Sequence, residues 1–403
     1  MHVLIIGGAL SGLSLAQMLR KHGISFTVFE RDETPDSRFQ GWAIALHSIL
    51  GDLKASFPDD MPDMLRATSH LAPLDLPAQM AFYVDDHSGR TGAEHSEEVP
   101  WVRCERRRLR DWLSTKIPVQ WNKRMSSMKE DDSGVTVYFE DGTSARGDIV
   151  VGADGFNSAV RRSLLGKPLE DLVNLVPFTN IIGEVTLSGA AFERQLSLGH
   201  SAYRYGPTDS NYVLFVGLHC VLPDGLSGKY YWILGERDTT AGCADHWLRT
   251  ATPQQKLDYI MELTKNAPPK LREILELTPV SGIQAEFKPW RDMELESLPT
   301  GRVALVGDAA HTMTPFRGEG GMFALIDSLD LGKRLAGAKS EDIVGLVREY
   351  HDEMLARSGP AVRRSRGATG KPDGGTLPTY GGRIPTELPP ETISLATVKR
   401  LVY

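Results

Sequence analysis

The chain has 403 residues, of which 41% are hydrophobic and 24% charged, and its formal net charge is −7 at pH 7. This length allows one large core or two modest ones, and the composition is ordinary for a soluble globular protein. A negative net charge without a basic tract gives no support to a nucleic-acid partner or to binding on an anionic membrane surface.

Cysteine spacing and the lengths of apolar runs exclude further classes. Cys104, Cys220 and Cys243 are far apart and odd in number, so they predict neither a disulfide framework nor a metal site, and they fit a reducing cytosol. The first strand is expected directly after Met1, which leaves no room for a signal peptide. No apolar run reaches the ~18 residues needed to cross a bilayer. We therefore expect a cytoplasmic protein without a membrane span or a metal.

The first elements of the chain predict a dinucleotide-binding unit. Val3 to Ile6 form an apolar, β-branched run typical of a buried strand, and Ile24 to Phe29 form a second one that ends at Glu30. Between them lie a helix-like stretch and, directly after the first strand, a turn of small residues: Gly7, Gly8, Ala9 and Gly12. Such a turn lets a pyrophosphate approach the amides of a helix N-terminus, while the acid accepts hydrogen bonds from a ribose.

The identity of this ligand stays open at this point. Ala9 stands where the usual G-x-G-x-x-G pattern has its second glycine, so the ligand would approach more tightly or slightly displaced. The acid at position 30 disfavours a 2′-phosphate, which leaves FAD or NAD ahead of NADP. The alternative interpretation is a tight turn in another kind of α/β protein.

The next segment predicts a mixture of loops and single elements. Residues 101–117 fit a helix, because Leu109 and Leu113 lie four residues apart on one face. The other expected elements are a loop at 36–47, irregular surface at 51–100 with a strand at 80–84, and strands at 135–139 and 149–151.

The chain changes character between residues 178 and 237. Alternating segments separated by turns such as PTDS and LPDGLSG predict a run of antiparallel strands, and therefore a second domain or a sheet layer inserted into the first. Helices are expected at 253–277, split by a pair of prolines, and at 341–366. Residues 367–403 are rich in glycine and proline and predict a tail or a lid.

Two later turns repeat the pattern of a strand that delivers an acid to a glycine-rich turn. DIVVGADG brings Asp154 and Gly155 to the start of a helix. The strand Val303–Val306 leads into GDAAH, which contains Asp308, and the glycines of PFRGEGG open another helix. Three such strand ends suit a long cofactor that crosses the carboxyl edge of a parallel sheet.

On these motifs the chain resembles the group A flavoprotein monooxygenases, the family of para-hydroxybenzoate and salicylate hydroxylases, and their short fungal-type members most. The resemblance covers residues 1–366 and is strongest at GGALSG…FER, DIVVGADGFNSAVR and RVALVGDAAHTMTPFRGEGG. It implies an α/β fold in which a Rossmann-like FAD-binding domain carries an inserted antiparallel β-sheet substrate domain. The implied boundaries are 1–72, 101–177 and 286–366 for the FAD-binding domain, 73–100 and 178–285 for the substrate domain, and 367–403 for the tail or lid.

The resemblance also implies a role for each matching position. Arg106 would contact the cofactor phosphate and ribityl region, Asp308 the ribityl chain, and Asp154 both FAD and NAD(P)H. The loop with Arg38 and Gln40 would lie near the flavin. The implied cofactor-binding residues are Gly7, Gly8, Ala9, Gly12, Glu30, Arg31, Arg38, Arg106, Asp154, Asp308, Pro315, Gly318, Gly320, Gly321 and Met322. Family members often carry asparagine at the last of these positions, so that contact would come from backbone amides here.

The expected reaction follows from the same resemblance. Anionic reduced FAD, favoured by the amides of the helix that begins near Gly320, would react with O₂ to a C4a-hydroperoxide that transfers oxygen in a water-free site. NADH or NADPH would supply the electrons without a Rossmann domain of its own, since no second G-x-G-x-x-G is present. The expected substrate is a small aromatic or polyketide-like molecule, hydroxylated or epoxidised in secondary metabolism by a monomer or homodimer.

The substrate face is expected among the alternating strands. The candidate catalytic residues are His219, Tyr205, Tyr230 and Trp232, with Tyr203 beside them. His219 would act as a base toward a phenol, whereas His311 in the GDAAH turn would be structural. The alternative for each aromatic side chain is a place in the core.

Two other functions remain open from the sequence. The same fold serves flavin-dependent oxidases and redox-neutral cyclases, while a halogenase is disfavoured because its W-x-W-x-I-P motif is absent. The second is a non-catalytic binding protein with a decayed flavin site. Ala9 and Met322 support it, whereas Glu30, Asp154 and Asp308 oppose it.

Overall fold

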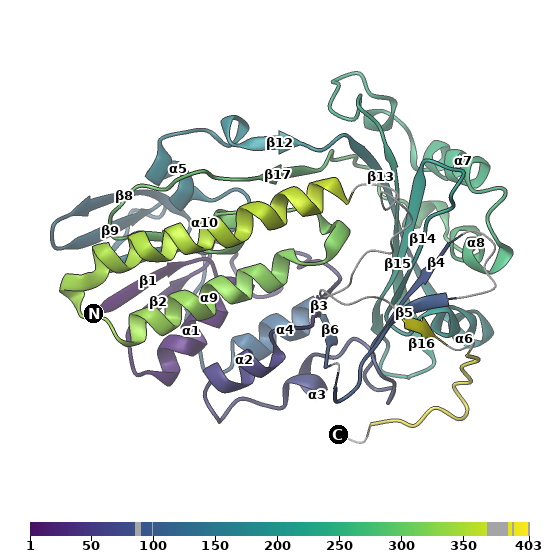
Figure 1. Ribbon diagram of the computed structural model, residues 1–403, viewed down its shortest axis with the longest axis horizontal. Helices are drawn as coiled ribbons and strands as arrows, with labels where there is room; N and C mark the ends of the chain where they lie inside the picture. Colours follow the sequence, from purple (N-terminus) through teal and green to yellow (C-terminus); the bar gives the residue numbers. More distant parts are fainter. Residues whose placement is uncertain (85–89, 99, 369–385, 389–390, 402–403) are drawn as a thin grey trace.

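The structure is a computed structural model that describes residues 1–84, 90–98, 100–368, 386–388 and 391–401. Two units lie side by side in Figure 1, one built on a five-stranded parallel sheet and the other on a seven-stranded mixed sheet. We call them the parallel-sheet unit and the large-sheet unit. This is the α/β architecture that the sequence predicts, while the residue boundaries of the domains stay a prediction.

The parallel-sheet unit begins with the expected strand, turn, helix and strand. β1 forms because its apolar, mostly β-branched side chains are almost all buried, and it pairs in parallel with β2 and β11. The sheet order is β18-β11-β1-β2-β7. These strands are β1 (His2–Ile6), β2 (Ser25–Phe29), β7 (Val119–Gln120), β11 (Ile149–Gly152) and β18 (Val303–Leu305).

Helices and a small antiparallel sheet pack on this parallel sheet. α1 lies against α9, and α9 against α10, and the two later helices cross in front of β1 and β2 in Figure 1. The sheet β10-β9-β8 packs beside β1 and β11. The elements are α1 (Leu10–Lys21), α4 (Arg106–Leu113), α5 (Ala159–Leu165), α9 (Gly320–Ala336), α10 (Ile343–Gly367), β8 (Met125–Asp131), β9 (Gly134–Phe139) and β10 (Ser144–Gly147).

The large-sheet unit has the strand order β13-β16-β15-β14-β4-β5-β19. Its strands are β4 (Gln79–Tyr83), β5 (Arg90–Glu94), β13 (Phe178–Ser188), β14 (Ala202–Tyr205), β15 (Tyr212–Val221), β16 (Ser227–Arg237) and β19 (Thr386–Leu388). The helices α6 (Gly189–Leu198), α7 (Pro253–Leu263) and α8 (Pro269–Glu276) cover the face that points away from the parallel-sheet unit (Figure 1). The expectation of strands alone over 178–237 is wrong at α6, and the sheet is mixed because β14 pairs in parallel with β4.

Residues between these sheets form short elements that the sequence pattern resolves less well. The predicted helix at 101–117 begins as a strand, because Val102 and Cys104 are buried and the segment pairs with β3. Glu105 then caps α4 by accepting amide hydrogen bonds. The remaining elements are β3 (Ala43–Leu46), α2 (Leu50–Ser56), α3 (Met64–Thr68), β6 (Val102–Glu105), β12 (Val173–Leu175) and β17 (Arg291–Met293), so residues 51–100 are more regular than expected.

The described part of the C-terminal segment packs on the large-sheet unit. β19 pairs with β5, and three apolar side chains of this segment are buried in the core under α6 to α8: Leu388, Ile393 and Leu395. The expectation that residues 367–403 form only a tail or lid with little to pack is therefore wrong for these parts. Residues 369–385, 389–390 and 402–403 lie outside the described residues.

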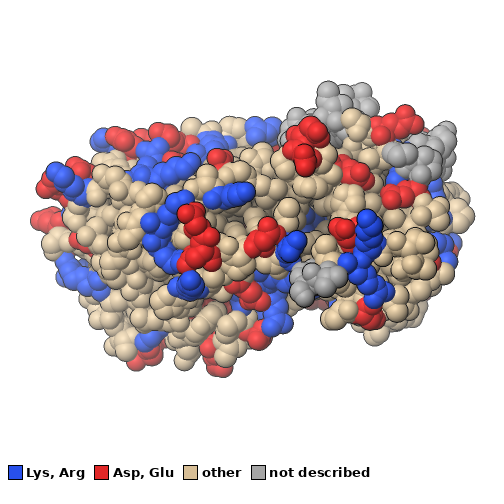
Figure 2. All heavy atoms as spheres, turned by 90° about the horizontal axis from the view of Figure 1, so that it is seen from below, with Lys and Arg blue, Asp and Glu red and all other residues tan. Residues whose placement is uncertain are grey.

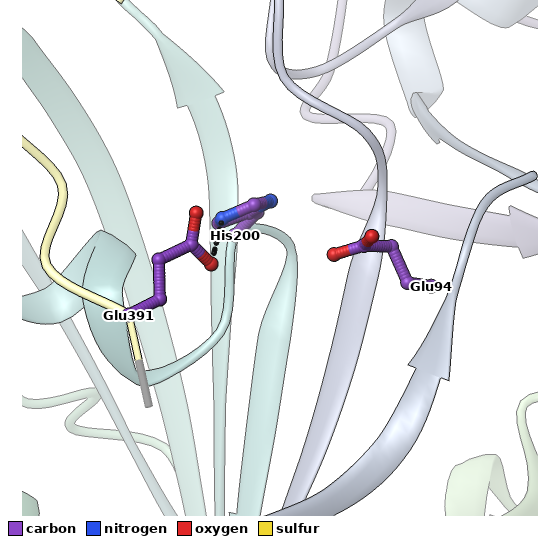
Figure 3. A group of neighbouring side chains, drawn as sticks. All are labelled: Glu94, His200 and Glu391. Atoms are coloured by element: carbon purple, nitrogen blue, oxygen red, sulfur yellow. Dashed lines mark hydrogen bonds and ion pairs between the residues drawn. The ribbon is translucent and has the colours of Figure 1, made fainter. Parts of the chain in front are cut away.

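An ion network holds this segment in place. His200 lies between Glu94 and Glu391 in Figure 3, with its Nδ1 donating to the Pro77 carbonyl oxygen at 2.9 Å and its Nε2 2.9 Å from the Glu391 carboxylate. Possible ligand atoms of Glu94, His200 and Glu391 lie within 4.8 Å of one another, a grouping that no spacing in the sequence indicates. Arg90 also pairs with Glu391 at 3.4 Å, so the network supplies its own positive charge.

The distribution of surface charge and the hydropathy of the helices are relevant to nucleic-acid and membrane partners. Figure 2 shows basic and acidic side chains interspersed on the face seen from below, without a large region of one sign. Within the described ranges, no helix combines the length and the hydropathy that crossing a membrane requires.

Candidate cofactor and substrate site

The turn between β1 and α1 accepts only glycine at two positions. Gly7 has φ +118°, and a Cβ built there would lie 2.3 Å from the Ala153 carbonyl oxygen. A Cβ at Gly12 would lie 2.0 Å from the Gly7 carbonyl oxygen. Both contacts are to backbone, so a side chain would force the turn apart. The turn therefore keeps a bare backbone, which suits the close approach of a phosphate.

Glu30 lies against the same turn. Its buried carboxylate accepts the Gly8 N–H at 2.7 Å and the Asp32 N–H at 3.1 Å. This is the place where the sequence expects a ribose contact. Arg31 follows it and borders an open hollow of about 730 Å³, which Asn122 also lines.

Two helix N-termini near these turns offer amides without side-chain caps. In the described part of the chain, neither α1 nor α9 has a capping side chain or an acid in its first turn. A Cβ at Gly321 would lie 1.8 Å from Cδ1 of Ile44, so the start of α9 packs closely on β3. The Met322 side chain is buried and accepts the Ser48 hydroxyl at 3.1 Å, which leaves its amide as the group available to a ligand.

Asp154 serves as a helix cap at the end of β11. Its carboxylate accepts the Ala159 N–H at 2.7 Å and the Val160 N–H at 3.2 Å. Burial raises the pKa of Asp154, and these hydrogen bonds oppose the shift. Gly155 beside it has φ +77° and no atom within 4 Å of its Cβ position. The motif thus presents open backbone at Gly155, while the acid fixes the turn.

Arg161 ties this turn to the GDAAH turn, and the sequence did not single it out. Its buried guanidinium donates to the carbonyl oxygens of Phe156 at 2.6 Å and Ala309 at 2.9 Å. Its signal in the sequence is an arginine that follows Ala159 and Val160 in the first turn of the helix. Because both acceptors lie in the two turns, Arg161 sets the distance between them.

Asp308 and Arg106 lie close enough for their opposite charges to influence each other. The Asp308 side chain is exposed, yet burial by the surrounding protein raises its pKa, with Arg106 opposing. Burial likewise lowers the pKa of the half-buried Arg106, and the Asp308 carboxylate opposes that shift. These two side chains of opposite charge are the polar groups that the sequence expects along the middle of a cofactor chain.

A buried ion network holds the GDAAH turn from behind. Asp327 of α9 is fully buried and accepts the Gly307 N–H at 2.9 Å, the His311 Nε2–H at 2.5 Å and an Arg357 N–H at 2.9 Å. Burial raises the pKa of the Asp327 carboxyl, but His311 and Arg357 outweigh it, so the pKa lies below its ordinary value. For His311, burial lowers the pKa and Asp327 more than compensates. This geometry gives His311 the structural role that the sequence predicts.

The loop with Arg38 and Gln40 is fastened to both units. Arg38 forms an ion pair within the loop at 2.8 Å, and the Gln40 side chain donates to the Arg38 carbonyl oxygen at 3.3 Å. Trp42 donates to Glu184 of β13 at 3.1 Å, and its ring stacks on Tyr231 of β16 with centroids 4.3 Å apart. The loop therefore bridges the parallel-sheet unit and the large sheet.

The turn before α9 meets aromatic side chains. Pro315–Arg317 form one 3₁₀ turn, closed by Gly318 at φ +65°. The Phe316 ring lies 4.8 Å from that of Phe178 and 4.6 Å from that of Trp290 between centroids. Phe178, at the start of β13 in the large sheet, and Trp290, just before β17, thus reach the turn that the sequence places against the flavin.

The aromatic side chains predicted for the substrate face lie on the face of the large sheet that α6, α7 and α8 cover. Tyr205, Tyr230 and Trp232 are buried in the core formed with α6, α7 and α8, together with Tyr203. Tyr231, between the two predicted residues on β16, points to the opposite face, where its ring stacks on Trp42 and its hydroxyl accepts a hydrogen bond from Arg103 of β6. The expectation that the three side chains line the substrate site is therefore corrected.

The face toward the parallel-sheet unit carries Phe215, His219 and Tyr231, and β6 adds Arg103. The His219 Nε2 lies 3.3 Å from Oε1 of Glu105, and of this set the sequence singled out only the histidine. Burial raises the pKa of Glu105, but the hydrogen bonds from His219 and from the first amides of α4 outweigh it, and the pKa is lowered. The other residues were missed because the face they share is set by tertiary packing.

Comparisons with known proteins agree with this architecture. The sequence pattern described as the FAD binding domain matches residues 1–49 and 249–365. The FAD-dependent monooxygenase thnD of Trichoderma harzianum is 52% identical over 373 residues, which cover 91% of this chain and 92% of the relative. An Arthroderma benhamiae relative, named as a probable FAD-dependent monooxygenase, is 31% identical over 408 residues. The matched region covers 91% of this chain and 90% of the relative.

Solved structures confirm the predicted fold class. Klebsiella pneumoniae HpxO, solved with FAD and uric acid, superposes with a TM-score of 0.70 at 23% identity. The superposed region covers 92% of this chain and 88% of the HpxO chain. The 2,6-dihydroxypyridine-3-hydroxylase of Arthrobacter nicotinovorans superposes with a TM-score of 0.69 at 18% identity and covers 98% of both chains. At these identities the likeness shows the fold alone.

The residues of the site fit FAD. A flavin dinucleotide needs a bare turn for its pyrophosphate, and Gly7 and Gly12 keep the β1–α1 turn bare. It needs donors for a long polar chain and a reduced ring, and the Arg106 guanidinium and the uncapped α9 N-terminus can supply them.

Proposed function

This chain belongs to the FAD-dependent monooxygenases, and from that premise we propose that it uses NADH or NADPH and O₂ to hydroxylate or epoxidise a planar aromatic or polycyclic molecule in secondary metabolism. We further propose that it acts in the cytoplasm as a monomer or homodimer. Bound FAD supplies the electron transfer and O₂ activation that side chains cannot. The route of oxygen transfer stays a prediction.

One observation carries the substrate class. The large sheet meets the parallel-sheet unit with aromatic side chains at two places, the Trp42–Tyr231 stack and the cluster around Phe316. Flat rings favour planar ligands and exclude water, which the chemistry requires. The names of two solved proteins of this fold, with uric acid and a dihydroxypyridine, also describe planar ring compounds as their ligand or substrate.

The proposed roles of individual residues are as follows. Gly7, Gly12 and Glu30 would hold the ADP half of FAD, and Arg106 with Asp308 the middle of the cofactor. The N-terminus of α9 would favour negative charge on the bound ring. His219 has its Nε2 against Glu105, which leaves Nδ1 as the atom to accept a proton from substrate.

The test mixes the FAD-loaded protein with NADPH or NADH in the absence of O₂, alone and with a panel of phenols and polycyclic aromatics. Faster bleaching of the flavin absorbance with some compounds, followed by transfer of one atom of isotope-labelled O₂ to the product, supports the proposal. A yellow protein that neither nucleotide bleaches would favour an oxidase or a redox-neutral cyclase. A protein that cannot be loaded with FAD would contradict the function.

A further inference from the structure

Arg103 is a buried cation that pairs with no acid among the described residues. Its side chain is 5% exposed, and its Nε is buried without a hydrogen-bond partner in the described part of the chain. The guanidinium lies over the rings of Phe215 at 5.6 Å and Tyr231 at 5.9 Å, and it donates to the Tyr231 hydroxyl. A buried charge without a counter-ion costs folding stability, so its retention calls for a functional reason.

Two acids close to this face are committed to other partners. Glu105, two residues along β6, accepts hydrogen bonds from the first amides of α4 and lies 3.3 Å from His219. Glu184 accepts the indole N–H of Trp42, whose ring covers Tyr231. Among the described residues neither acid pairs with Arg103, so its charge is left to a ligand.

The Tyr231 hydroxyl points to the same conclusion. Because this oxygen accepts a hydrogen bond from Arg103, its own proton is free to be donated. A Cβ at Gly217 would lie 2.8 Å from the Tyr231 ring and 2.9 Å from Nη2 of Arg103, so the absence of a side chain there admits the pair. Two donors therefore converge on the face of the large sheet that meets the parallel-sheet unit.

We propose that Arg103 and Tyr231 bind an oxyanion of the substrate, either an ionised phenol or enol or a carboxylate. This assignment rests on the proposed function, since it places the anion in the same site. Charge-assisted hydrogen bonds from a guanidinium in a desolvated site are strong and directional. The pair thereby selects acidic planar molecules over neutral ones of the same shape and fixes the orientation of the ring.

The experiment measures binding to the FAD-loaded protein with three matched bicyclic probes: 4-hydroxycoumarin, coumarin-3-carboxylate and the neutral 4-methoxycoumarin. Perturbation of the flavin absorbance or calorimetry gives Kd for wild type, Arg103→Gln, Arg103→Lys and Tyr231→Phe. The matched control is Arg348→Gln, at an exposed arginine of α10. We expect wild type to prefer the anions, and Arg103→Gln to weaken an anion about tenfold or more while changing the neutral probe less than about twofold.

The outcomes separate the alternatives. A loss of affinity in Arg103→Gln that is confined to the enol or to the carboxylate supports the proposal and identifies the anion. Arg103→Lys should recover part of this affinity because the charge remains. Equal weakening of all three probes, or FAD-loaded wild type that binds none of them, overturns the proposal and makes Arg103 structural. If Arg103→Gln does not fold, Arg103→Lys and Tyr231→Phe must still discriminate between anion and ether. Wild type that does not take up FAD contradicts the proposed function instead.

Discussion

Replacing Gly7 by alanine tests the nucleotide turn most directly. The φ of +118° and the backbone oxygen of Ala153 at 2.3 Å from the new Cβ both oppose an alanine. The dihedral costs about 1–3 kcal/mol and the overpacking about 1–3 kcal/mol more. If the apoprotein relieves this strain by opening the turn, the same free energy opposes FAD binding. Two kcal/mol, the lower bound of the sum, corresponds to about 30-fold in Kd.

The matched control is Gly142→Ala in the turn between β9 and β10. Gly142 has φ +81°, but no atom lies within 4 Å of its Cβ position, so it carries the dihedral strain without the clash. FAD titration of the apoproteins, with circular dichroism to verify folding, should give a weakened Gly7→Ala and an unchanged Gly142→Ala. A folded Gly7→Ala with wild-type affinity for FAD would refute the role assigned to this turn.

Three further results are expected. Asp327→Ala should destabilise the protein by about 3–5 kcal/mol in urea unfolding, because His311 and Arg357 lose their buried counter-ion; a loss below 1 kcal/mol would contradict the network. In wild type, the contribution of the Asp327–His311 pair to the free energy of unfolding should be fully present between pH 3.8 and 6.5. It should decline as pH falls through the lowered pKa of Asp327 or rises through the raised pKa of His311. Urea unfolding of wild type and Asp327→Asn at several pH values measures this. Gly217→Ala should keep its FAD content and weaken substrate binding, since the new Cβ displaces Tyr231, and an unchanged Kd would speak against that face.

The strand, turn and helix at the expected cofactor end were predictable because they are local in sequence. A strand, a glycine turn and a helix start within a dozen residues determine the backbone around Gly7, and the acid at Glu30 lies at the end of the neighbouring strand. Short local stretches of sequence likewise determine the backbone of the turns at Asp154 and Asp308. The sequence did not indicate that the Asp154 carboxylate turns back to cap its own helix, because that depends on side-chain rotamers.

The substrate end was predictable only in part. Alternation along β16 correctly separates Tyr230 from Tyr231, but both faces of the large sheet are buried, so the pattern does not say which face meets the parallel-sheet unit. The strand β6 was missed because its pairing with β3 is long-range, while a helical pattern follows without a break. Arg103 was missed with it, since a surface helix is the ordinary place for an arginine-rich run.

The long helix α9 connects the separate turns at which the cofactor is expected. Its first turn presents uncapped amides, Asp327 two turns later holds the amide of Gly307, and the Ser328 hydroxyl donates to the Ser11 carbonyl oxygen in the first turn of α1 at 2.8 Å. α9 can lie this near α1 because Gly332 has no side chain, and a Cβ there would lie 2.8 Å from that of Met18. The spacing between the β1–α1 turn, the Asp308 turn and the N-terminal amides of α9 is therefore set by helix packing behind these turns, and a side chain at Gly332 would shift all three together.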